Sequence, residues 1–312
     1  MFRKLNNLGL KRPDCALFCR IRNEDYFIPH FLSHYRRLGI EHFYFADDKS
    51  TDGTREFLLA QPDCTVIDSE LRFHETVGKM KVKDIVRLRV PAELIGDGWT
   101  LIVDTDEFAV LPEEYATFGD LARDLDRRGE ISCIASMVDF YPRTLGERFA
   151  SRDTNPFEAF PFFDIGPYFI WKQGQLRPML LHAGVRHRIN EWIFAHNREI
   201  WSVYRPTMLN KVPFFRWGRG MLPVGPHHVS IPPYTETQIV LGHFKFYPDL
   251  DAKIAEGVES EFYHGSSYYY RVLQLYLPHL KDVSLLSLVT RRYKGPEDLK
   301  RARLLFANGR PF

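Results

Sequence analysis

Residues 15–48, CALFCRIRNEDYFIPHFLSHYRRLGIEHFYFADD, decide the fold of this chain through their hydrophobic pattern. The continuous apolar run of residues 15–21 is typical of a buried parallel strand. Apolar residues then recur at helical spacing over residues 27–39, and Gly39 is a favourable residue to end a helix. A second strand over residues 41–48 ends in two aspartates. The stretch therefore predicts a strand, a helix and a second parallel strand.

The same alternation continues as far as residue 106. The sequence predicts a capped turn and a helix over residues 48–61, a strand over 64–69, a basic helix over 78–90 and a strand over 99–106. Strands that alternate with helices form parallel sheets with right-handed crossovers. We therefore predict an α/β fold with a mostly parallel central sheet flanked by helices.

Polar side chains fall at the carboxyl ends of these predicted strands. Asn23 follows the first strand, Asp47 and Asp48 end the second, and Asp104 and Asp106 form a D-x-D after another. In open α/β sheets, ligands bind beyond the carboxyl ends of the strands. A lone D-x-D is more often an acidic turn or a helix cap. Its place after a buried strand, together with the earlier aspartate pair, favours a ligand site.

The two carboxylates of the D-x-D have the chemistry of a metal site. Alternate side chains of an extended segment point the same way, so Asp104 and Asp106 can converge on one hard cation. Mg²⁺ or Mn²⁺ prefers oxygen ligands and leaves coordination positions open for a substrate diphosphate. Such a metal would neutralise the charge of a departing nucleoside diphosphate.

Two motifs stand out: residues 22–54 read RNEDYFIPHFLSHYRRLGIEHFYFADDKSTDGT, and residues 104–108 read DTDEF. Together they resemble glycosyltransferase family 2, in particular its soluble glycosyltransferase 2-like branch. The resemblance implies the GT-A fold and a nucleotide-activated sugar as donor, with a UDP-sugar expected. It also implies that D-x-D carboxylates bind the donor diphosphate through a divalent metal, Mn²⁺ or Mg²⁺.

The resemblance assigns roles to residues of the first half. Asp47 is similar to the family aspartate that contacts the nucleobase or ribose, with Asp48 as its neighbour, and Asp104 and Asp106 are similar to the D-x-D. Asp106 is also placed in the catalytic set. The remaining residues expected at the donor come from the loop after the first strand: Arg22, Asn23 and Glu24.

Two segments of the second half, residues 210–230 and 241–254, are similar more loosely to parts of the same branch that carry a lysine, a histidine and a later His-aromatic pair. The matching lysine is Lys211, and the later pair is His243 with Phe244. Lys211 is either a cation for the diphosphate or a solvated loop lysine.

The histidine of that pattern is His228, with His227 as the alternative, in a stretch bounded by proline and glycine. Imidazole at this place is either a metal ligand, a phosphate hydrogen-bond donor or a structural histidine. We expect at least one of the two histidines on the same face of the sheet as Asp104 and Asp106. Glu191, within residues 186–192, is a candidate for the acidic catalytic base of inverting members, although the usual E-D dipeptide is absent.

Composition limits the class of protein. The chain has 312 residues, 45% of them hydrophobic and 26% charged, which is typical of a soluble globular protein. A formal net charge of +2 does not indicate a nucleic-acid partner, and none is expected. The 4 cysteines fit neither a zinc motif nor a disulfide framework, and we expect reduced core thiols.

The chain lacks the apolar region of a signal peptide and any apolar run long enough to span a membrane. A cytoplasmic location is expected. The amphipathic tail over residues 267–295 would either pack on its own domain or contact the inner face of a membrane. We expect two parts: a catalytic domain over residues 1–259 and a helical C-terminal extension over residues 260–312.

These patterns together predict a metal-dependent, inverting glycosyltransferase that moves a sugar from a nucleotide-sugar to a hydroxyl of a saccharide or glycolipid acceptor. Aromatic segments over residues 155–171 and 213–222 would line the acceptor site or simply fill a core. One alternative is a nucleotide-sugar-binding protein without transferase activity. Another is a nucleotidyltransferase, but the loop after the first strand lacks its Gly-rich phosphate motif.

Overall fold

The computed structural model describes most of the chain and divides it into two compact units. The described residues are 2–6, 8, 14–149, 152–166, 169–171, 179–181, 184–197, 209–218, 220–224, 227–231, 235–260 and 268–307. The first unit comprises residues 1–135, 211–241 and 303–312, and the second comprises residues 136–210 and 242–302. We call them unit 1 and unit 2.

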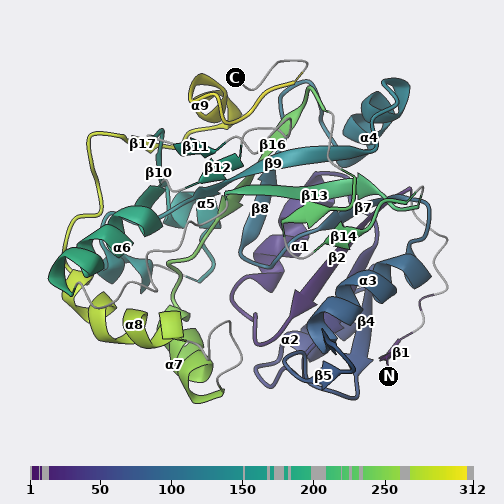
Figure 1. Cartoon of the computed structure of the whole chain (residues 1–312), viewed down its shortest axis with the longest axis horizontal. Coiled ribbons are helices and arrows are strands. Elements are labelled where there is room, and N and C mark those ends of the chain that lie inside the picture. The colour runs from purple at the N-terminus through teal and green to yellow at the C-terminus, as the bar shows by residue number, and fades with distance from the viewer. Residues whose placement is uncertain are drawn as a thin grey trace. The chain divides into compact units, whose positions relative to one another are not determined.

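Nine strands among the described residues form one sheet in the order β1-β4-β3-β2-β7-β13-β9-β16-β8 (Figure 1). Their bounds are β1 Phe2–Lys4, β2 Cys15–Ile21, β3 Phe43–Asp47, β4 Cys64–Ser69, β7 Trp99–Ile102, β8 Glu107–Val110, β9 Ser132–Asp139, β13 Asn210–Arg216 and β16 Gln238–His243. The pairs β4-β3, β3-β2 and β2-β7 are parallel. β1 pairs with β4, and β13 with β7, antiparallel. The predicted α/β fold is confirmed.

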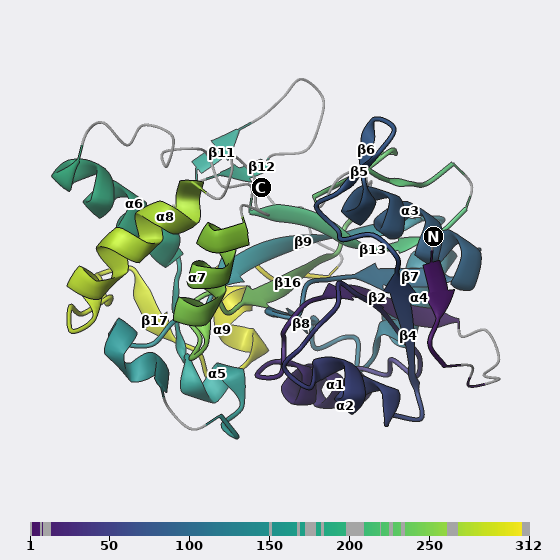
Figure 2. The ribbon, with the colours of Figure 1, turned by 90° about the horizontal axis from the view of Figure 1, so that it is seen from below.

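Helices cover both faces of the parallel strands in unit 1. Figure 2 shows α3 on one side of these strands and α1 and α2 on the other. The helices of unit 1 are α1 Ile28–Arg37, α2 Thr54–Leu59, α3 Val82–Leu94 and α4 Phe118–Arg127. Gly39, with φ 78°, follows α1, and Thr117 starts α4 with a capping box to Asp120.

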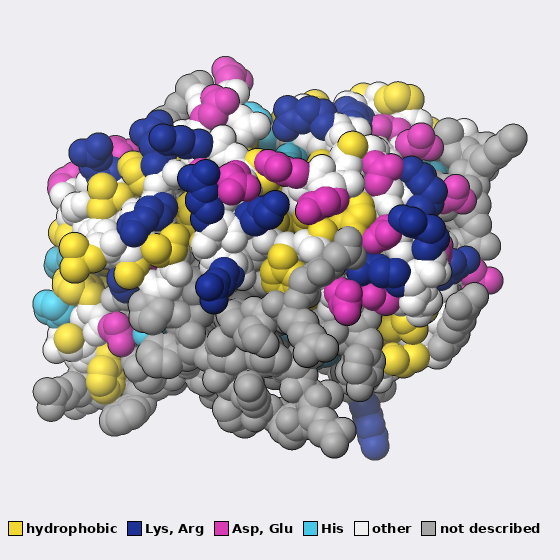
Figure 3. Space-filling model, turned by 90° about the horizontal axis from the view of Figure 1, so that it is seen from above, with side chains coloured by type: hydrophobic (Ala, Val, Ile, Leu, Met, Phe, Trp, Pro, Cys, Tyr) yellow, Lys and Arg dark blue, Asp and Glu magenta, His cyan; other side chains and the backbone are white. Residues whose placement is uncertain are grey.

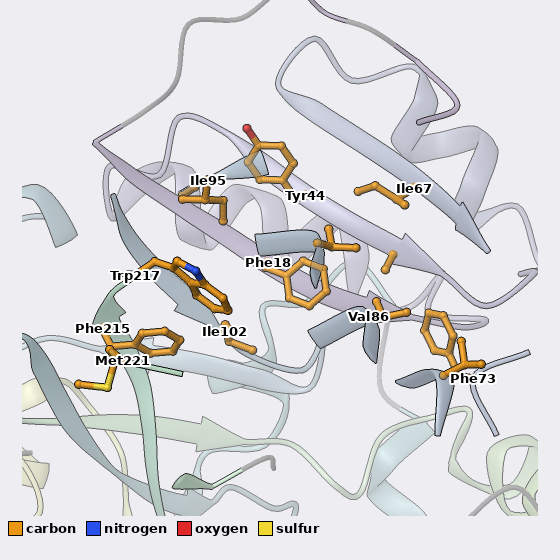
Figure 4. Packing of buried hydrophobic residues seen from close by; sticks show 14 residues of the cluster. Phe18, Tyr44, Ile67, Phe73, Val86, Ile95, Ile102, Phe215, Trp217 and Met221 are labelled. Atoms are coloured by element: carbon orange, nitrogen blue, oxygen red, sulfur yellow. The ribbon is translucent and has the colours of Figure 1, made fainter. Parts of the chain in front are cut away.

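The core beneath α3 fixes which residues of the sheet face this helix. Val86 of α3 packs in one cluster with Phe18 of β2, Ile102 of β7 and Phe215 of β13 (Figure 4). Side chains two residues apart on a strand lie on the same face. The polar residues that follow this pattern toward the carboxyl ends of the strands are therefore expected on the α3 side.

Unit 2 is built from short strands and helices around an aromatic core. Its elements are β10 Phe162–Asp164 paired with β17 Thr290–Arg292, β11 Phe169–Trp171 paired with β12 Met179–Leu181, the helices α5 Pro156–Ala159, α6 Gly184–His196, α7 Leu250–Ser260, α8 Tyr268–Tyr276 and α9 Pro296–Arg301, and the 3₁₀ turns η1 Leu145–Phe149 and η3 Leu277–Leu280. Phe140 contacts Phe157, Phe163, Phe244 and Tyr293. The aromatic residues of 155–163 are thus largely core, whereas residues 167 and 168 lie outside the described residues.

Several predicted elements differ in their bounds. The basic helix starts at Val82 and runs to Leu94, because residues 76–81 form the hairpin of β5 Thr76–Val77 and β6 Met80–Lys81 around Gly78, whose φ is 62°. Beyond Ser260, the described chain contains strand β17 as well as helices. The division into a catalytic domain and a C-terminal extension stays a prediction.

All four cysteines are free and buried, which agrees with the predicted core thiols. They are Cys15, Cys19, Cys64 and Cys133, and all belong to unit 1. Among the described residues, no helix has the length and apolar character needed to cross a membrane. Acidic and basic side chains alternate over the surface seen in Figure 3, as a net charge of +2 would suggest.

Candidate functional site

The loops that follow β2 and β3 are tied together by hydrogen bonds. Asn23 has a φ of 52°, a left-handed conformation that asparagine tolerates better than most residues. Its backbone N–H donates to Ser50 Oγ at 3.0 Å, and its Oδ1 accepts from the Thr51 N–H at 2.8 Å. The Glu24 N–H donates to Thr54 Oγ1 at 2.9 Å. Two of the predicted donor-binding residues thus position a loop pair at the carboxyl edge of the sheet.

The aspartates predicted to meet the nucleoside are buried and already bonded. Asp47 is fully buried and accepts a hydrogen bond from Arg55 Nε at 2.5 Å. Asp48 accepts from Arg72 Nε at 2.9 Å, and burial raises the pKa of its carboxyl group above the ordinary value. Arg22 Nη1 donates to the Asp48 carbonyl at 2.7 Å. In this structure these residues shape the loops.

The first carboxylate of the D-x-D lies between two cations because of strand register. Both neighbours of β7 are aligned with it, through the pairs Phe18↔Ile102 and Phe214↔Leu101. Continuing the parallel register by two residues sets Arg20 beside Asp104, and continuing the antiparallel register by three sets Lys211 on its other side. Arg20 Nη2 lies 3.8 Å from Asp104 Oδ1, and Lys211 Nζ lies 3.6 Å from Oδ2.

The charged residues around Asp104 differ in how far they are buried. The side chain of Asp104 is 46% exposed, whereas Lys211 and Glu107 are buried and bond each other, with Nζ 2.5 Å from Oε2. Burial opposes ionisation of Asp104, but Lys211 and Arg20 outweigh it and hold the pKa of the carboxyl group below its ordinary value. Burial likewise opposes charge on Lys211, and Glu107 and Asp104 keep its pKa raised. Asp104 is therefore ionised and open to solvent.

The D-x-D segment is a turn and not an extended strand. β7 ends at Ile102, and the Asp104 N–H donates to Glu107 Oε2 at 2.9 Å while the Glu107 N–H donates to the Asp104 carbonyl at 3.1 Å. The prediction of a strand as far as Asp106 is wrong, because the Glu107 side chain holds this turn. Asp106 still lies close enough to Asp104 for its charge to oppose ionisation there.

A small cavity of about 10 Å³ opens beside this turn, roughly the space of one water molecule. Its polar lining consists of Arg87, Asp104, Lys211 and His228. Lys211 belongs to β13 and is 4% exposed, so the alternative of a solvated loop lysine is wrong. We call Arg20, Arg87, Asp104, Glu107 and Lys211 the donor-edge cluster.

The two histidines of the second half lie on a short hairpin of unit 1. β14 Pro223–Val224 pairs antiparallel with β15 His228–Val229. His228 is exposed and lines the cavity with Asp104, whereas His227 is partly buried in the turn before β15. Imidazole and carboxylate are donors that Mn²⁺ accepts. Within the described ranges, however, no three His, Cys, Asp or Glu side chains are grouped so as to hold a metal ion.

The candidate base and the His-aromatic pair belong to unit 2. Glu191 lies on α6, is exposed, and has its Oε1 3.3 Å from His187 Nε2. His243 is buried, with Nδ1 2.7 Å from Asp139 Oδ1, and Phe244 packs in the aromatic core. Glu191 therefore belongs to unit 2, whereas all residues of the donor-edge cluster belong to unit 1.

A second set of buried charges lies in unit 2. Asp139 pairs with His243 and, at 2.7 Å, with Arg186 Nε, and we call these three the Asp139 cluster. Burial opposes ionisation, but Arg186 and His243 lower the pKa of the Asp139 carboxyl group to about 2. Asp164 is paired in the same manner, with Arg188 Nη2 at 3.1 Å.

Three members of the donor-edge cluster, Arg20, Arg87 and Glu107, were not identified from sequence. Arg20 is the single charge in the apolar run 15–21, and a charge in a buried strand near its carboxyl end is a usable signal. Arg87 falls among the buried positions of α3 in the same way. Glu107 adjoins the D-x-D, but its bond to the turn depends on tertiary structure.

No protein-family model matches the chain, and no curated protein does. Among solved structures, the chain is similar to S. aureus TarS 1-349 in complex with UDP, at 17% identity and a TM-score of 0.32, over 44% of this chain and 39% of that chain. A structure of S. aureus TarS matches at 19% identity and a TM-score of 0.32, over 41% of this chain and 22% of that chain. The chain thus spans well under half of either TarS chain. Similarity at this TM-score supports no conclusion about function.

Proposed function

We propose that the chain is a glycosyltransferase that uses a nucleotide-sugar, with a UDP-sugar as donor. The observation that carries the proposal is the position of Asp104, a half-exposed carboxylate at the carboxyl end of β7 with Arg20 and Lys211 in register on either side. This is the edge at which α/β sheets bind ligands. Arginine and lysine are the side chains that neutralise phosphate charge.

The loop pair after β2 and β3 would receive the nucleoside. Arg22, Asn23 and Glu24 contribute backbone and side-chain groups, and Asp47 and Asp48 hold these groups in place through their buried bonds. Direct contact of a ribose hydroxyl with Asp47 would require an exchange with Arg55 or Ser50 as hydrogen-bond donor. Recognition through the loop backbone needs no such exchange.

Metal dependence is part of the proposal. Asp104 and Asp106, with His228 or alternatively His227, would hold Mn²⁺ or Mg²⁺, and their oxygen and nitrogen donors suit these ions. The metal, when bound, would neutralise charge on the leaving diphosphate. Lys211 and Arg20 are placed to do the same from the protein side.

The proposed transfer inverts the anomeric centre. A carboxylate removes the proton of the acceptor hydroxyl, the hydroxyl oxygen attacks the anomeric carbon, and the bond from that carbon to the diphosphate oxygen breaks on the opposite face. Glu191 is the proposed base, since its carboxylate on α6 is exposed. The acceptor is a saccharide or glycolipid hydroxyl.

We place the protein in the cytoplasm, with peripheral contact to the inner face of a membrane. Three large apolar side chains of unit 2 support this: Phe149, Leu275 and Leu288 are 55%, 67% and 97% exposed. Basic residues such as Arg291 accompany them. Sedimentation with anionic vesicles tests the contact, and a Leu275→Ser/Leu288→Ser variant that sediments as the wild type does would contradict it.

Calorimetry with UDP in the presence of Mn²⁺ and then of EDTA tests the donor site. Asp106→Ala is expected to abolish Mn²⁺-dependent UDP binding and to leave the fold intact, because Asp106 is only half-buried in the turn before β8. Glu114→Ala, an exposed acid beyond β8, is the matched control and should bind as the wild type does. Unchanged Mn²⁺-dependent affinity in Asp106→Ala would rule out the metal assignment. UDP-sugar binding without transfer to any acceptor would favour a non-catalytic binding protein.

A further inference from the structure

Arg87 is a buried cation without a matching hydrogen-bond acceptor. It lies on α3 among Val86 and Val90 and is 5% exposed. Among the residues that the structure describes, its guanidinium forms an ion pair only with Asp84, whose Oδ1 lies 4.0 Å from Nη1 on a side chain that is 42% exposed. Its Nε is buried and makes no hydrogen bond within the described chain. A charge in such surroundings is unfavourable unless an anion compensates it.

A structural arginine in this protein is bonded differently. Arg148 of unit 2 is as buried as Arg87, and its Nε likewise makes no hydrogen bond within the described chain. Its Nη1, however, donates to the Leu145 carbonyl at 2.8 Å, and its Nη2 bonds the Asp251 carboxylate. Arg87 has neither kind of bond to a described residue. Packing of its aliphatic stem in the core of α3 explains the burial of the carbon atoms and leaves the guanidinium unexplained.

The surroundings of Arg87 carry an excess of positive charge. Arg20, Lys83 and Lys211 all lie close enough to affect its ionisation or to be affected by it. The carboxylates that oppose them, Asp104 and Glu107, are shared with Arg20 and Lys211. Burial, followed by the charge of Arg20, lowers the pKa of Arg87 to about 10, so the group stays charged at neutral pH.

The cavity gives Arg87 access to a ligand. Arg87 lines it together with Lys211, and two other lining side chains reach solvent, since Asp104 is 46% exposed and His228 is exposed. A space of about 10 Å³ admits one oxygen atom of an anion rather than a whole diphosphate.

We propose that Arg87 is a ligand of the donor diphosphate, which donates to one phosphate oxygen inserted into the cavity beside Lys211. The proposal rests on the proposed function and extends it to a residue of α3. A planar guanidinium and an ammonium on either side of one phosphate oxygen supply directed hydrogen bonds and charge together. In the free protein Arg87 then has only the distant, half-exposed Asp84 as its ion-pair partner, because its close partner is the substrate.

The test compares Arg87→Met with Arg89→Met. Both remove one arginine from α3, but Arg89 is 60% exposed and pairs with Glu93. Calorimetry with UDP and with inorganic pyrophosphate is expected to show a loss of at least tenfold in affinity for both probes in Arg87→Met. Arg89→Met should stay within twofold of the wild type.

Thermal unfolding of the free protein separates binding from structure. If the free protein lacks an anion that compensates Arg87, Arg87→Met removes an unfavourable buried charge, and its Tm should equal or exceed that of the wild type. The rise in Tm that pyrophosphate induces in the wild type should disappear in this variant. Wild-type affinity in Arg87→Met, or a Tm well below that of Arg89→Met, would overturn the proposal. Should Arg87→Met not fold, Arg87→Lys decides: a tenfold loss of pyrophosphate affinity supports the proposal and wild-type affinity overturns it.

The two probes distinguish this proposal from the proposed function. Pyrophosphate binding that depends on Arg87, without any binding of UDP, would keep the ligand role and contradict the nucleotide-sugar function. UDP binding that is unaffected by Arg87→Met would keep the function and overturn the ligand role.

Discussion

The donor-edge cluster of unit 1 and the Asp139 cluster of unit 2 contain the same kinds of side chain but are paired to different degrees. Asp139 is 1% exposed at its side chain and bonds both Arg186 and His243 at 2.7 Å. Asp104 is 46% exposed and has its cations at 3.6 and 3.8 Å. One carboxylate is saturated by protein groups, and the other leaves room for a ligand.

We propose that this difference separates charges that stabilise the fold from charges that bind a ligand. A buried carboxylate with short bonds to several cations has no free oxygen to bind a substrate. Removal of one partner leaves the other charge buried and uncompensated. A looser cluster holds its cations farther from the carboxylates, as the 4.0 Å between Arg87 Nη1 and Asp84 Oδ1 shows. Perturbed ionisation alone would not distinguish the two, since the pKa values of both Asp104 and Asp139 are lowered.

The largest expected effect is on the saturated cluster. Asp139→Asn leaves Arg186 and His243 without the carboxylate that compensates them, so the free energy of unfolding should fall by about 3–5 kcal/mol. Urea denaturation measures the change. Glu297→Gln, which removes an exposed carboxylate paired with Arg301 in the same unit, should change it by less than about 0.5 kcal/mol. An effect of Asp139→Asn as small as that of Glu297→Gln would show that the Asp139 carboxylate does not compensate Arg186 and His243.

Lys211→Met is expected to lie between these extremes. The substitution removes the cation that pairs with Glu107, whose side chain is 2% exposed. A buried carboxyl group without a cation can, however, take up a proton and become neutral. We therefore expect a loss of about 2 kcal/mol near neutral pH, with stability regained as the pH is lowered. Denaturation at several pH values checks this. The paired variant Lys211→Met/Glu107→Gln should recover part of the loss, and an additive double variant would show that the two residues do not interact.

Acid should weaken the saturated cluster at a defined pH. The pKa of Asp139 is lower in the folded protein, at about 2, than the ordinary 3.8, so its contribution is present above about pH 4 and is lost as the pH falls toward 2. The contribution amounts to about 2 kcal/mol. The difference in stability between the wild type and Asp139→Asn, measured from pH 6 to pH 2.5, should shrink over this interval. A constant difference would contradict the assignment.

The smallest effect on stability is expected at Glu191. Its carboxylate is exposed and pairs only with His187 at 3.3 Å among the contacts described for it, so Glu191→Gln should change the free energy of unfolding by less than about 0.5 kcal/mol. If Glu191 is the base, transfer falls by about 100-fold or more with donor affinity unchanged. Unchanged transfer would assign the base to another residue, and Glu259→Gln, at an exposed glutamate of α7, is a matched surface control.

The sequence predicted the strands at residues 15–21 and 64–69 with their correct bounds, because a continuous apolar run of that length has few other uses in an α/β fold. The strand predicted over residues 99–106, in contrast, extends beyond the observed end of β7 at Ile102. In residues 103–106 the β-branched Val103 and Thr105 alternate with aspartates, a pattern that fits a strand. The bond from the Asp104 N–H to Glu107 selects a turn instead. Local pattern does not include such side-chain competition for the backbone.

The composition of the donor-edge cluster could be predicted only in part. The D-x-D after an apolar run indicates Asp104, and the family resemblance indicates Lys211, yet their contact depends on β13 pairing antiparallel with β7 across a long stretch of sequence. Nothing local in residues 210–216 specifies that neighbour. Asp47 and Asp48 were placed at the right edge, but Arg55 and Arg72, which bond them, became visible only in three dimensions.

The positions of the four cysteines make it possible to monitor the unfolding of unit 1 separately from that of unit 2. All four thiols are buried in unit 1, and burial raises the pKa values of Cys15, to about 12, and of Cys19 and Cys64. Because the thiolate is the reactive form, an alkylating reagent will label these sites only when the surrounding structure opens. Unit 2 contains no cysteine. The number of labelled thiols per chain, counted by mass spectrometry during partial denaturation, therefore reports the opening of the unit with the donor-edge cluster, while opening confined to unit 2 adds no label.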